Sequence, residues 1–160
     1  MKQRILFIDR DGTILREPED EQIDSYDKFE FLPGVITALS FLARHTDYKL
    51  VLVSNQDGLG TDSYPEADFW PTHNLMLDIL RGEGIVFYAQ HIDRSFPHEN
   101  LPTREPGTAM LTSYMNNPEV DMEHSYVIGD RQTDAQLAEF SRQVERVSNA
   151  AEENEIEKRE

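Results

Sequence analysis

Two carboxylates stand two residues apart near the start of the chain, in the segment Phe7-Ile8-Asp9-Arg10-Asp11-Gly12-Thr13. They follow the apolar run Ile5–Ile8, which is typical of a buried strand. Because residues i and i+2 of a strand lie on the same side, Asp9 and Asp11 are expected to converge at its carboxyl end. Two carboxylates held that close need a cation to offset their repulsion, and hard oxygen ligands favour Mg²⁺. The segment therefore predicts a metal-dependent site for a phosphate group.

A simpler interpretation of the same residues is an Asp-Gly turn after an ordinary strand. Gly12 gives the backbone the freedom to turn away at once. This interpretation accounts for Asp11 and Gly12, but it does not account for the second acid.

A second apolar run, Leu50–Val53, is followed by Ser54-Asn55-Gln56-Asp57-Gly58-Leu59-Gly60. The hydroxyl of Ser54 and nearby backbone amides are suited to hold phosphate oxygens. A plain glycine-containing loop is the alternative for this segment taken alone.

A third run, Tyr126–Ile128, leads into Gly129-Asp130-Arg131-Gln132-Thr133-Asp134. Asp130 is placed to complete a metal shell. Asp134 is expected either to support the metal ligands from behind or to serve as the N-cap of the next helix, which is the commonest role of such a residue. Acids, a hydroxyl and glycines at several strand ends together favour a site, because open α/β sheets bind ligands there.

The elements that position these residues alternate along the chain. Strands are predicted over Ile5–Ile8, Leu50–Val53, Ile85–Ile92 and Tyr126–Ile128, and helices over Gly34–Arg44, Pro71–Arg81, Thr108–Met115 and Asp134–Val147. Short apolar runs that end in polar or glycine-rich segments are typical of buried parallel strands. The polar segment Leu15–Phe31 is predicted to be a flap or hairpin. The order predicts an α/β fold with a mostly parallel sheet between two layers of helices, and with a small or absent cap.

The carboxyl-terminal part differs from the rest, since no apolar strand run follows the helix predicted to end at Val147. Residues 150–160 read AAEENEIEKRE, which favours a charged tail, a loose helix or a linker. We therefore expect one domain over residues 1–149 and a tail or linker over 150–160.

The amino-acid composition narrows the range of possible functions. The 160 residues carry 31 acids and 15 bases, so the net charge is −16 and nucleic-acid binding is disfavoured. No apolar run reaches 18 residues, so no membrane segment is expected. The absence of cysteine excludes thiolate chemistry and fits the cytoplasm. An anionic substrate needs local positive charge, and Arg10, Arg104 and Arg131 fall beside the candidate segments.

In combination, the DRDGT segment, the Ser54-Asn55 strand end and Gly129-Asp130-Arg131-x-Thr133-Asp134 resemble the haloacid dehalogenase superfamily of phosphotransferases. The stretches VSNQDGLGTDSYPEADFWPTHNLML and YVIGDRQTDAQLAE are similar to its histidinol-phosphate phosphatase branch. There the phosphatase precedes an imidazoleglycerol-phosphate dehydratase domain, so a fused dehydratase is an implied partner. The likeness spans about residue 4 to residue 140.

The resemblance implies a mechanism. Asp9 would be the nucleophile that forms an aspartyl-phosphate, and Asp11 would protonate the leaving alkoxide and then activate water. Mg²⁺ would be held by the side chains of Asp9 and Asp130 and by the backbone carbonyl of Asp11. Ser54, Asn55 and Arg104 would bind the phosphate.

The resemblance also implies histidinol phosphate, a small phosphomonoester with an amine and an imidazole, as the substrate. Glu17 and Asp57 match positions near the pocket and are hypothesised to recognise the amine. The alternative, that both are ordinary surface acids, has equal weight in so acidic a chain.

Two departures from the family stand out. The loop Asp93–Thr103, where many members bind zinc through cysteines, has no cysteine, so we expect no zinc. The family's Arg-Lys-Pro segment appears as Arg104-Glu105-Pro106, which reverses a charge beside the phosphate and would cost roughly 10² to 10⁴ in rate. Either Arg104 substitutes, or Glu105 points outward, or the chain is weakly active or inactive.

Three alternatives to a histidinol-phosphate phosphatase therefore stay open. One is a phosphatase-like module with impaired turnover, and another is a phosphatase of the same superfamily that acts on a sugar phosphate. A response-regulator-like receiver is least favoured, because the middle-strand Asp and late Lys of that class are not visible in the sequence.

Overall fold

The computed structural model describes residues 2–104, 109–131, 134, 136 and 145–147. Within these residues, five parallel strands form one sheet in the order β3-β2-β1-β4-β5. The strands are β1 (Ile5–Ile8), β2 (Lys49–Asn55), β3 (Ala89–Asp93), β4 (Tyr126–Ile128) and β5 (Glu145–Val147). The α-helices are α1 (Val35–His45), α2 (Glu66–Gly82) and α3 (Thr112–Met115), and short 3₁₀ turns cover Tyr26–Lys28, Pro97–Glu99, Ala109–Leu111 and Met122–His124.

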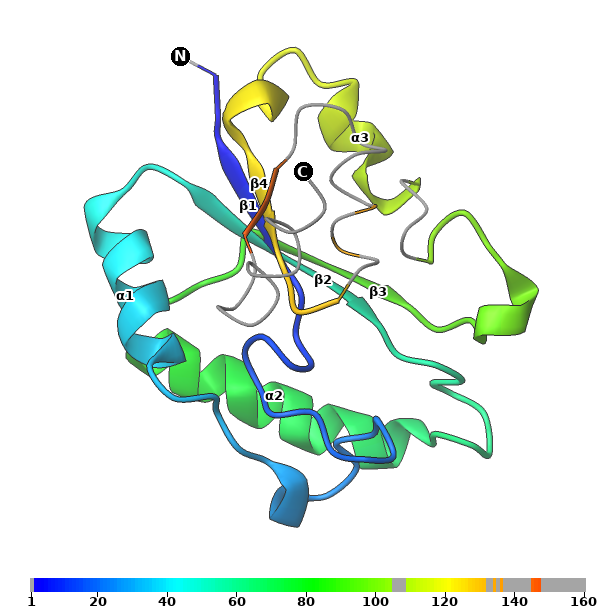
Figure 1. Cartoon of the computed structure of the whole chain (residues 1–160). Coiled ribbons are helices and arrows are strands. Elements are labelled where there is room, and N and C mark those ends of the chain that lie inside the picture. Colours follow the sequence, from blue (N-terminus) through cyan, green and yellow to red (C-terminus); the bar gives the residue numbers. More distant parts are fainter. Residues whose placement is uncertain (1, 105–108, 132–133, 135, 137–144, 148–160) are drawn as a thin grey trace, which may run out of the picture.

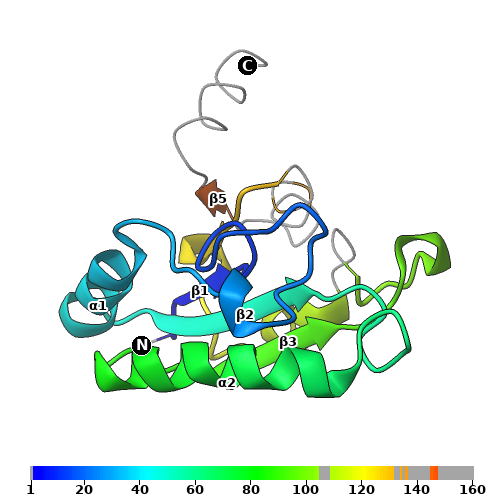
Figure 2. The same ribbon diagram turned by 90° about the horizontal axis from the view of Figure 1, so that it is seen from below.

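The sheet lies between two apolar cores, and the alternation of side chains along each strand divides them. Ile5 and Phe7 of β1 join a core with α3 and the turns beside it. Leu6 and Ile8 face the opposite core, with residues of α1 and α2. Figure 1 shows α1 and α2 on one face of the sheet and α3 on the other, and Figure 2 shows α1 and α2 from below. The predicted α/β fold with a parallel sheet between helical layers is confirmed.

Connections along the sheet reverse direction at β1. The chain moves from β1 outward to β2 and β3 and then returns to β4 on the other side of β1, in register with it at Leu6–Tyr126, Phe7–Val127 and Ile8–Ile128. The crevice at such a reversal, outside the carboxyl ends of the strands, is where open α/β sheets bind ligands. Asp9 stands at this point, and its backbone N–H donates to the Ile128 carbonyl over 2.9 Å.

Segment Leu15–Phe31 closes at its base as the predicted hairpin. Leu15 forms an antiparallel bridge with Phe31, and the Arg16 N–H donates to the Glu30 carbonyl over 2.8 Å. Its middle is fastened to α2 and to the loop before that helix, because the Ile23 carbonyl accepts hydrogen bonds from the hydroxyls of Thr72 in α2 and Tyr64 in the loop. We call Leu15–Phe31 the flap. Among the described residues it is the only insertion between β1 and α1, which agrees with a small or absent cap.

The observed boundaries of α2 and β3 differ from the predicted ones. Helix α2 begins at Glu66, so Pro71, expected at the start, lies inside it, and the buried side chains of Phe69, Thr72 and His73 hold both sides of the proline in one helix. Strand β3 begins at Ala89 rather than Ile85, since Ile85 closes the end of α2 through a bond to the Leu80 carbonyl.

The prediction of a helix through Val147 with no strand after it is wrong. Glu145–Val147 is strand β5, which pairs with β4 in parallel register. The apolar spacing that suggested a helix was carried partly by Val144 and Val147, and β-branched residues suit a short edge strand equally well. Residues 137–144 and the tail 150–160 lie outside the described residues, so the boundary at 149 stays a prediction.

Candidate active site

Three carboxylates meet in the crevice between β1 and β4. Asp9, Asp130 and Asp134 each present a carboxylate oxygen, and these oxygens all lie within 4.8 Å of one another. Asp9 follows β1 directly, and Asp130 and Asp134 come from the segment after β4. The structure thus brings together the predicted metal ligands Asp9 and Asp130. It adds Asp134, which was expected only behind them.

Two glycines make room for this cluster. At Gly12, where φ is +81°, a Cβ would overlap the carboxylate of Asp130, and at Gly129 a Cβ would overlap that of Asp134. The chain therefore turns and leaves space at the two places where carboxylates approach the backbone. Gly12 of the Asp-Gly turn also leaves room for the Asp130 carboxylate. The turn and the acidic site therefore occur together and are not alternatives.

The cluster suits a hard divalent cation. Burial raises the pKa of Asp130, and the neighbouring carboxylates of Asp134 and Asp11 raise it further, while Arg131 lowers it. Its Oδ1 is buried and makes no hydrogen bond to any residue that the structure describes. Asp130 thus has a buried carboxylate oxygen without a hydrogen-bond donor and lies beside two other acids, an arrangement that suits Mg²⁺. The residues present fit the expected metal.

Asp11 lines the same crevice, but its carboxylate is turned toward two partners. Nε of Arg10 donates to Oδ1 over 2.6 Å, and Nε2 of Gln56 donates to Oδ2 over 3.1 Å. Asp11 is therefore separate from the three-carboxylate cluster. The two acids of the DRDGT segment therefore have different surroundings.

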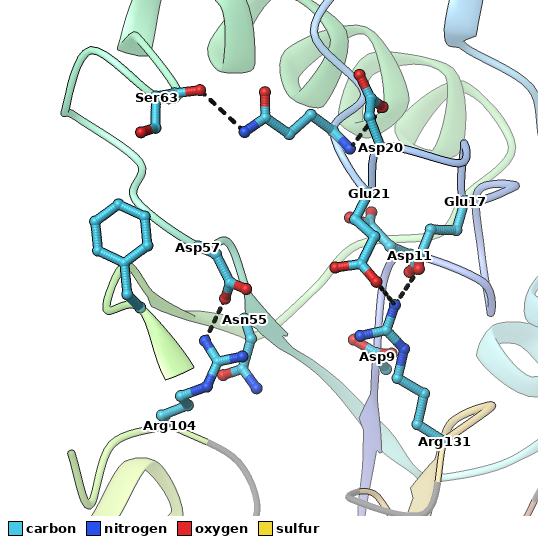
Figure 3. A pocket seen from close by; sticks show the side chains of 12 residues that line it. Asp9, Asp11, Glu17, Asp20, Glu21, Asn55, Asp57, Ser63, Arg104 and Arg131 are labelled. Carbon is cyan, nitrogen blue, oxygen red and sulfur yellow. Dashed lines mark hydrogen bonds and ion pairs between the residues drawn. The ribbon is translucent and has the colours of Figure 1, made fainter. Parts of the chain in front are cut away.

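A pocket opens above these acids and carries two arginine–carboxylate pairs (Figure 3). Arg104 contacts Asp57, and Arg131 contacts Glu17 and Glu21 of the flap. Burial raises the pKa of Glu17, and Arg131 opposes that shift. The pocket is lined by Asp9, Asp11, Glu17, Asp20, Glu21, Gln22, Asn55, Asp57, Ser63, Phe96, Arg104 and Arg131.

Ser54 and Asn55 differ in their access to this pocket. Asn55 lines it, whereas Ser54 is buried in β2 and its hydroxyl accepts a hydrogen bond from Gln56 over 2.9 Å. The structure thus brings Asn55, but not the Ser54 side chain, to the surface where a phosphate would lie.

The cysteine-free loop after β3 is ordered by a buried carboxylate. Asp93 accepts hydrogen bonds from the backbone and hydroxyl of Ser95 and from the hydroxyl of Thr103, so it closes the loop from one side to the other. The same loop carries Phe96 and Arg104 into the pocket, and Arg104 also donates to the Ser95 carbonyl over 2.9 Å. Glu105, the residue of reversed charge, lies outside the described residues.

Sequence reasoning did not assign a role to Arg131, Gln56 or Phe96. Arg131 was noted only for its place beside Asp130, and its pairing with the flap joins segments over a hundred residues apart. Gln56 lies in the same segment after a predicted strand as Ser54 and Asn55, and that position could have marked it as a site residue. Nothing in the sequence marked Phe96, which lines the pocket from the loop after β3.

The profile of the family described as "Polynucleotide kinase 3 phosphatase" matches residues 4–152. The chain belongs to this family. It is 56% identical over 139 residues to the histidine biosynthesis bifunctional protein HisB of Bacteroides fragilis, covering 86% of this chain and 37% of that protein. The corresponding protein of Spirosoma linguale is 54% identical over 137 residues, covering 85% and 36%. The chain thus spans little more than a third of these curated relatives.

Solved structures agree with this assignment. D,D-heptose 1,7-bisphosphate phosphatase from B. bronchiseptica, determined with magnesium and phosphate, superimposes with a TM-score of 0.77 at 26% identity, covering 87% of this chain and 76% of that one. A HAD-superfamily hydrolase from Geobacter sulfurreducens shares the fold with a TM-score of 0.56 at 12% identity, covering 91% and 89%. The predicted membership of the haloacid dehalogenase superfamily is confirmed.

Within the described part of the chain, no helix combines the length and the apolar character needed to cross a bilayer.

Replacing Gly12 by alanine tests whether the glycine makes room for the carboxylates. Gly34 has nearly the same φ, +79°, but no atom lies within 4 Å of the position of its Cβ. Gly34→Ala should therefore cost only the backbone strain, about 1 kcal/mol, while Gly12→Ala should cost about 1–3 kcal/mol more. Urea unfolding of both variants measures the difference. Equal losses would contradict the close approach of Asp130 to Gly12.

Proposed function

We propose that this chain is a Mg²⁺-dependent phosphomonoester hydrolase of histidine biosynthesis that works through an aspartyl-phosphate on Asp9. The observation that carries the proposal is the cluster of Asp9, Asp130 and Asp134 at the reversal of the sheet. A magnesium and phosphate complex of a related phosphatase, and HisB proteins over 50% identical to this chain, support the metal and the pathway.

In the proposed reaction, Asp9 attacks phosphorus and the bond from phosphorus to the ester oxygen breaks. Asp11 gives its proton to the departing alkoxide. Asp11 then takes a proton from water, and the water oxygen attacks phosphorus, which releases phosphate and frees Asp9. Asn55 and Arg104, which line the pocket, are proposed to hold the phosphate oxygens in line for both displacements.

The metal would be held by the side chains of Asp9 and Asp130 and by the backbone carbonyl of Asp11, with Asp134 beside them. When bound, Mg²⁺ supplies positive charge that lets a phosphate dianion approach these acids. This contribution matters in a pocket whose lining holds six carboxylates and two arginines.

Histidinol phosphate is the substrate that we propose, because it combines a phosphate with cationic nitrogen groups. Its phosphate would meet Arg104, and its amine would meet Glu17 and Asp57, each of which now pairs with an arginine. The charge of −16 disfavours a polynucleotide, despite the family's name. A cytoplasmic protein with a fused dehydratase domain is the proposed context, in keeping with the greater length of the HisB relatives.

Asp9→Asn should abolish turnover of histidinol phosphate, with a loss of at least about 10³-fold, because the amide cannot act as the nucleophile. Chelation by EDTA should abolish it as well, and added Mg²⁺ should restore it. Phosphate release is measured for wild type, Asp9→Asn and the exposed-site control Asp62→Asn. A wild type that is inactive with Mg²⁺ would reject the proposal, and Glu105→Lys would then show whether the reversed charge is the cause.

Glu17→Gln and Asp57→Asn test the assignment of substrate. Each should lower kcat/KM for histidinol phosphate about 10-fold more than for a neutral alkyl phosphate, because only the first substrate carries an amine to pair with the acid. Glu30→Gln is the control, since Glu30 lies on the same flap but pairs with Arg16 at an exposed position. Equal losses on both substrates would remove these acids from substrate recognition.

A further inference from the structure

We propose that Arg10, the residue between the two acids of the DRDGT segment, is a positioning residue. It holds the Asp11 carboxylate by Oδ1, so that Oδ2 is the oxygen that exchanges the proton with the leaving group and with water. The proposal rests on the function proposed above.

Arg10 makes this contact from a fully buried position. Its side chain has no exposed surface, and the Nε to Oδ1 distance is 2.6 Å. Among the residues that the structure describes, the donor to the other oxygen, Oδ2, is the neutral Nε2 of Gln56, over 3.1 Å. The charged hydrogen bond is the stronger of the two, so the two oxygens of Asp11 are not equivalent. The oxygen facing the weaker partner is the one that can exchange a proton at lower cost.

The guanidinium is itself fixed by α2. Nη1 of Arg10 lies 3.1 Å from Nδ1 of His73, and the guanidinium lies over the Phe69 ring, 4.9 Å from its centroid. Nε2 of His73 lies 2.7 Å from Oε1 of Gln90, which is an acceptor. Nε2 therefore carries the proton, and Nδ1 is free to accept from Arg10.

His73 must stay neutral for this arrangement. Burial lowers the pKa of His73 to about 4, and the nearby Arg10 lowers it as well, against the opposing effect of Gln90. At neutral pH the ring is an acceptor for Arg10 rather than a second buried cation. Successive contacts thus link Gln90 to His73, His73 to Arg10, and Arg10 to Asp11.

The backbone of Arg10 adds a second constraint. Its carbonyl accepts from the N–H groups of Ile14 over 2.8 Å and Leu15 over 3.1 Å, so the loop after β1 folds around this residue. The side chain anchors the same loop to α2. Arg10 therefore fixes where the carboxylates on either side of it stand relative to the rest of the pocket.

A buried ion pair such as Arg10–Asp11 is weak evidence of a role in stability. Well-packed apolar side chains replace buried ion pairs at no loss, and often with a gain, in measured cases. Arg10 pairs with the carboxylate that the proposed reaction uses as acid and base. Holding this carboxylate in place accounts for a buried arginine at this position. A proton donor with a fixed rotamer is what transfer to a poor leaving group requires.

The test uses Arg10→Lys, which keeps the charge but loses the planar fork, with Arg16→Lys at the exposed Arg16–Glu30 pair as the control. Single-turnover release of the leaving group is measured for histidinol phosphate and for p-nitrophenyl phosphate. Histidinol is a poor leaving group that needs a proton, whereas p-nitrophenolate leaves without one. Arg10→Lys should slow histidinol release about 10- to 100-fold and change p-nitrophenolate release less than about threefold.

The same measurement in an Asp11→Asn background completes a double-mutant cycle. Arg10→Lys should then have no further effect on histidinol release, because the residue acts through Asp11. Equal slowing of both esters, or an undiminished effect in the Asp11→Asn background, would overturn the positioning role while leaving the hydrolase proposal intact. A folded wild type that hydrolyses neither ester would overturn both.

Discussion

Mutual repulsion among three carboxylates is the constraint on which the rest of this structure depends. Oxygens of Asp9, Asp130 and Asp134 lie within 4.8 Å of one another, and like charges at that separation are costly wherever water is partly excluded. The topology brings them there, because β1 and β4 are neighbours and their carboxyl ends share a crevice. Gly12 and Gly129 leave room for the carboxylates of Asp130 and Asp134, because a Cβ at either glycine would overlap them. A divalent cation would offset this repulsion, so the geometry favours a metal site.

Positive charge is placed around this centre in two layers. Arg10 stands inside the protein and holds Asp11, while Arg104 and Arg131 stand in the pocket and pair with acids there. The flap and the loop after β3 are each joined to the pocket through one of these arginines. In a chain of charge −16, these arginines offset part of the negative charge around the pocket without changing the sign of the whole surface.

Local pattern was sufficient to predict the layers of the fold and much of the site. The runs Ile5–Ile8 and Tyr126–Ile128 are strands with the predicted bounds, and Asp9 and Asp130 converge as their positions after those strands required. The features that were not predicted depend on contacts between residues far apart in the chain. Strand β5 is held by pairing with β4, and the sequence of a three-residue segment does not predict such pairing. The burial of Ser54 and the place of Arg131 against the flap likewise follow from packing between segments far apart in the chain.

Binding of Mg²⁺ to the folded chain tests the central claim most directly, because it depends on neither substrate nor turnover. A ligand that binds the folded state raises the melting temperature, and millimolar Mg²⁺ should raise that of the wild type by about 3–8 °C. The shift should persist in Asp62→Asn, an exposed acid away from the cluster, and vanish in Asp130→Asn. An equal shift in all three proteins would contradict a metal held by these carboxylates.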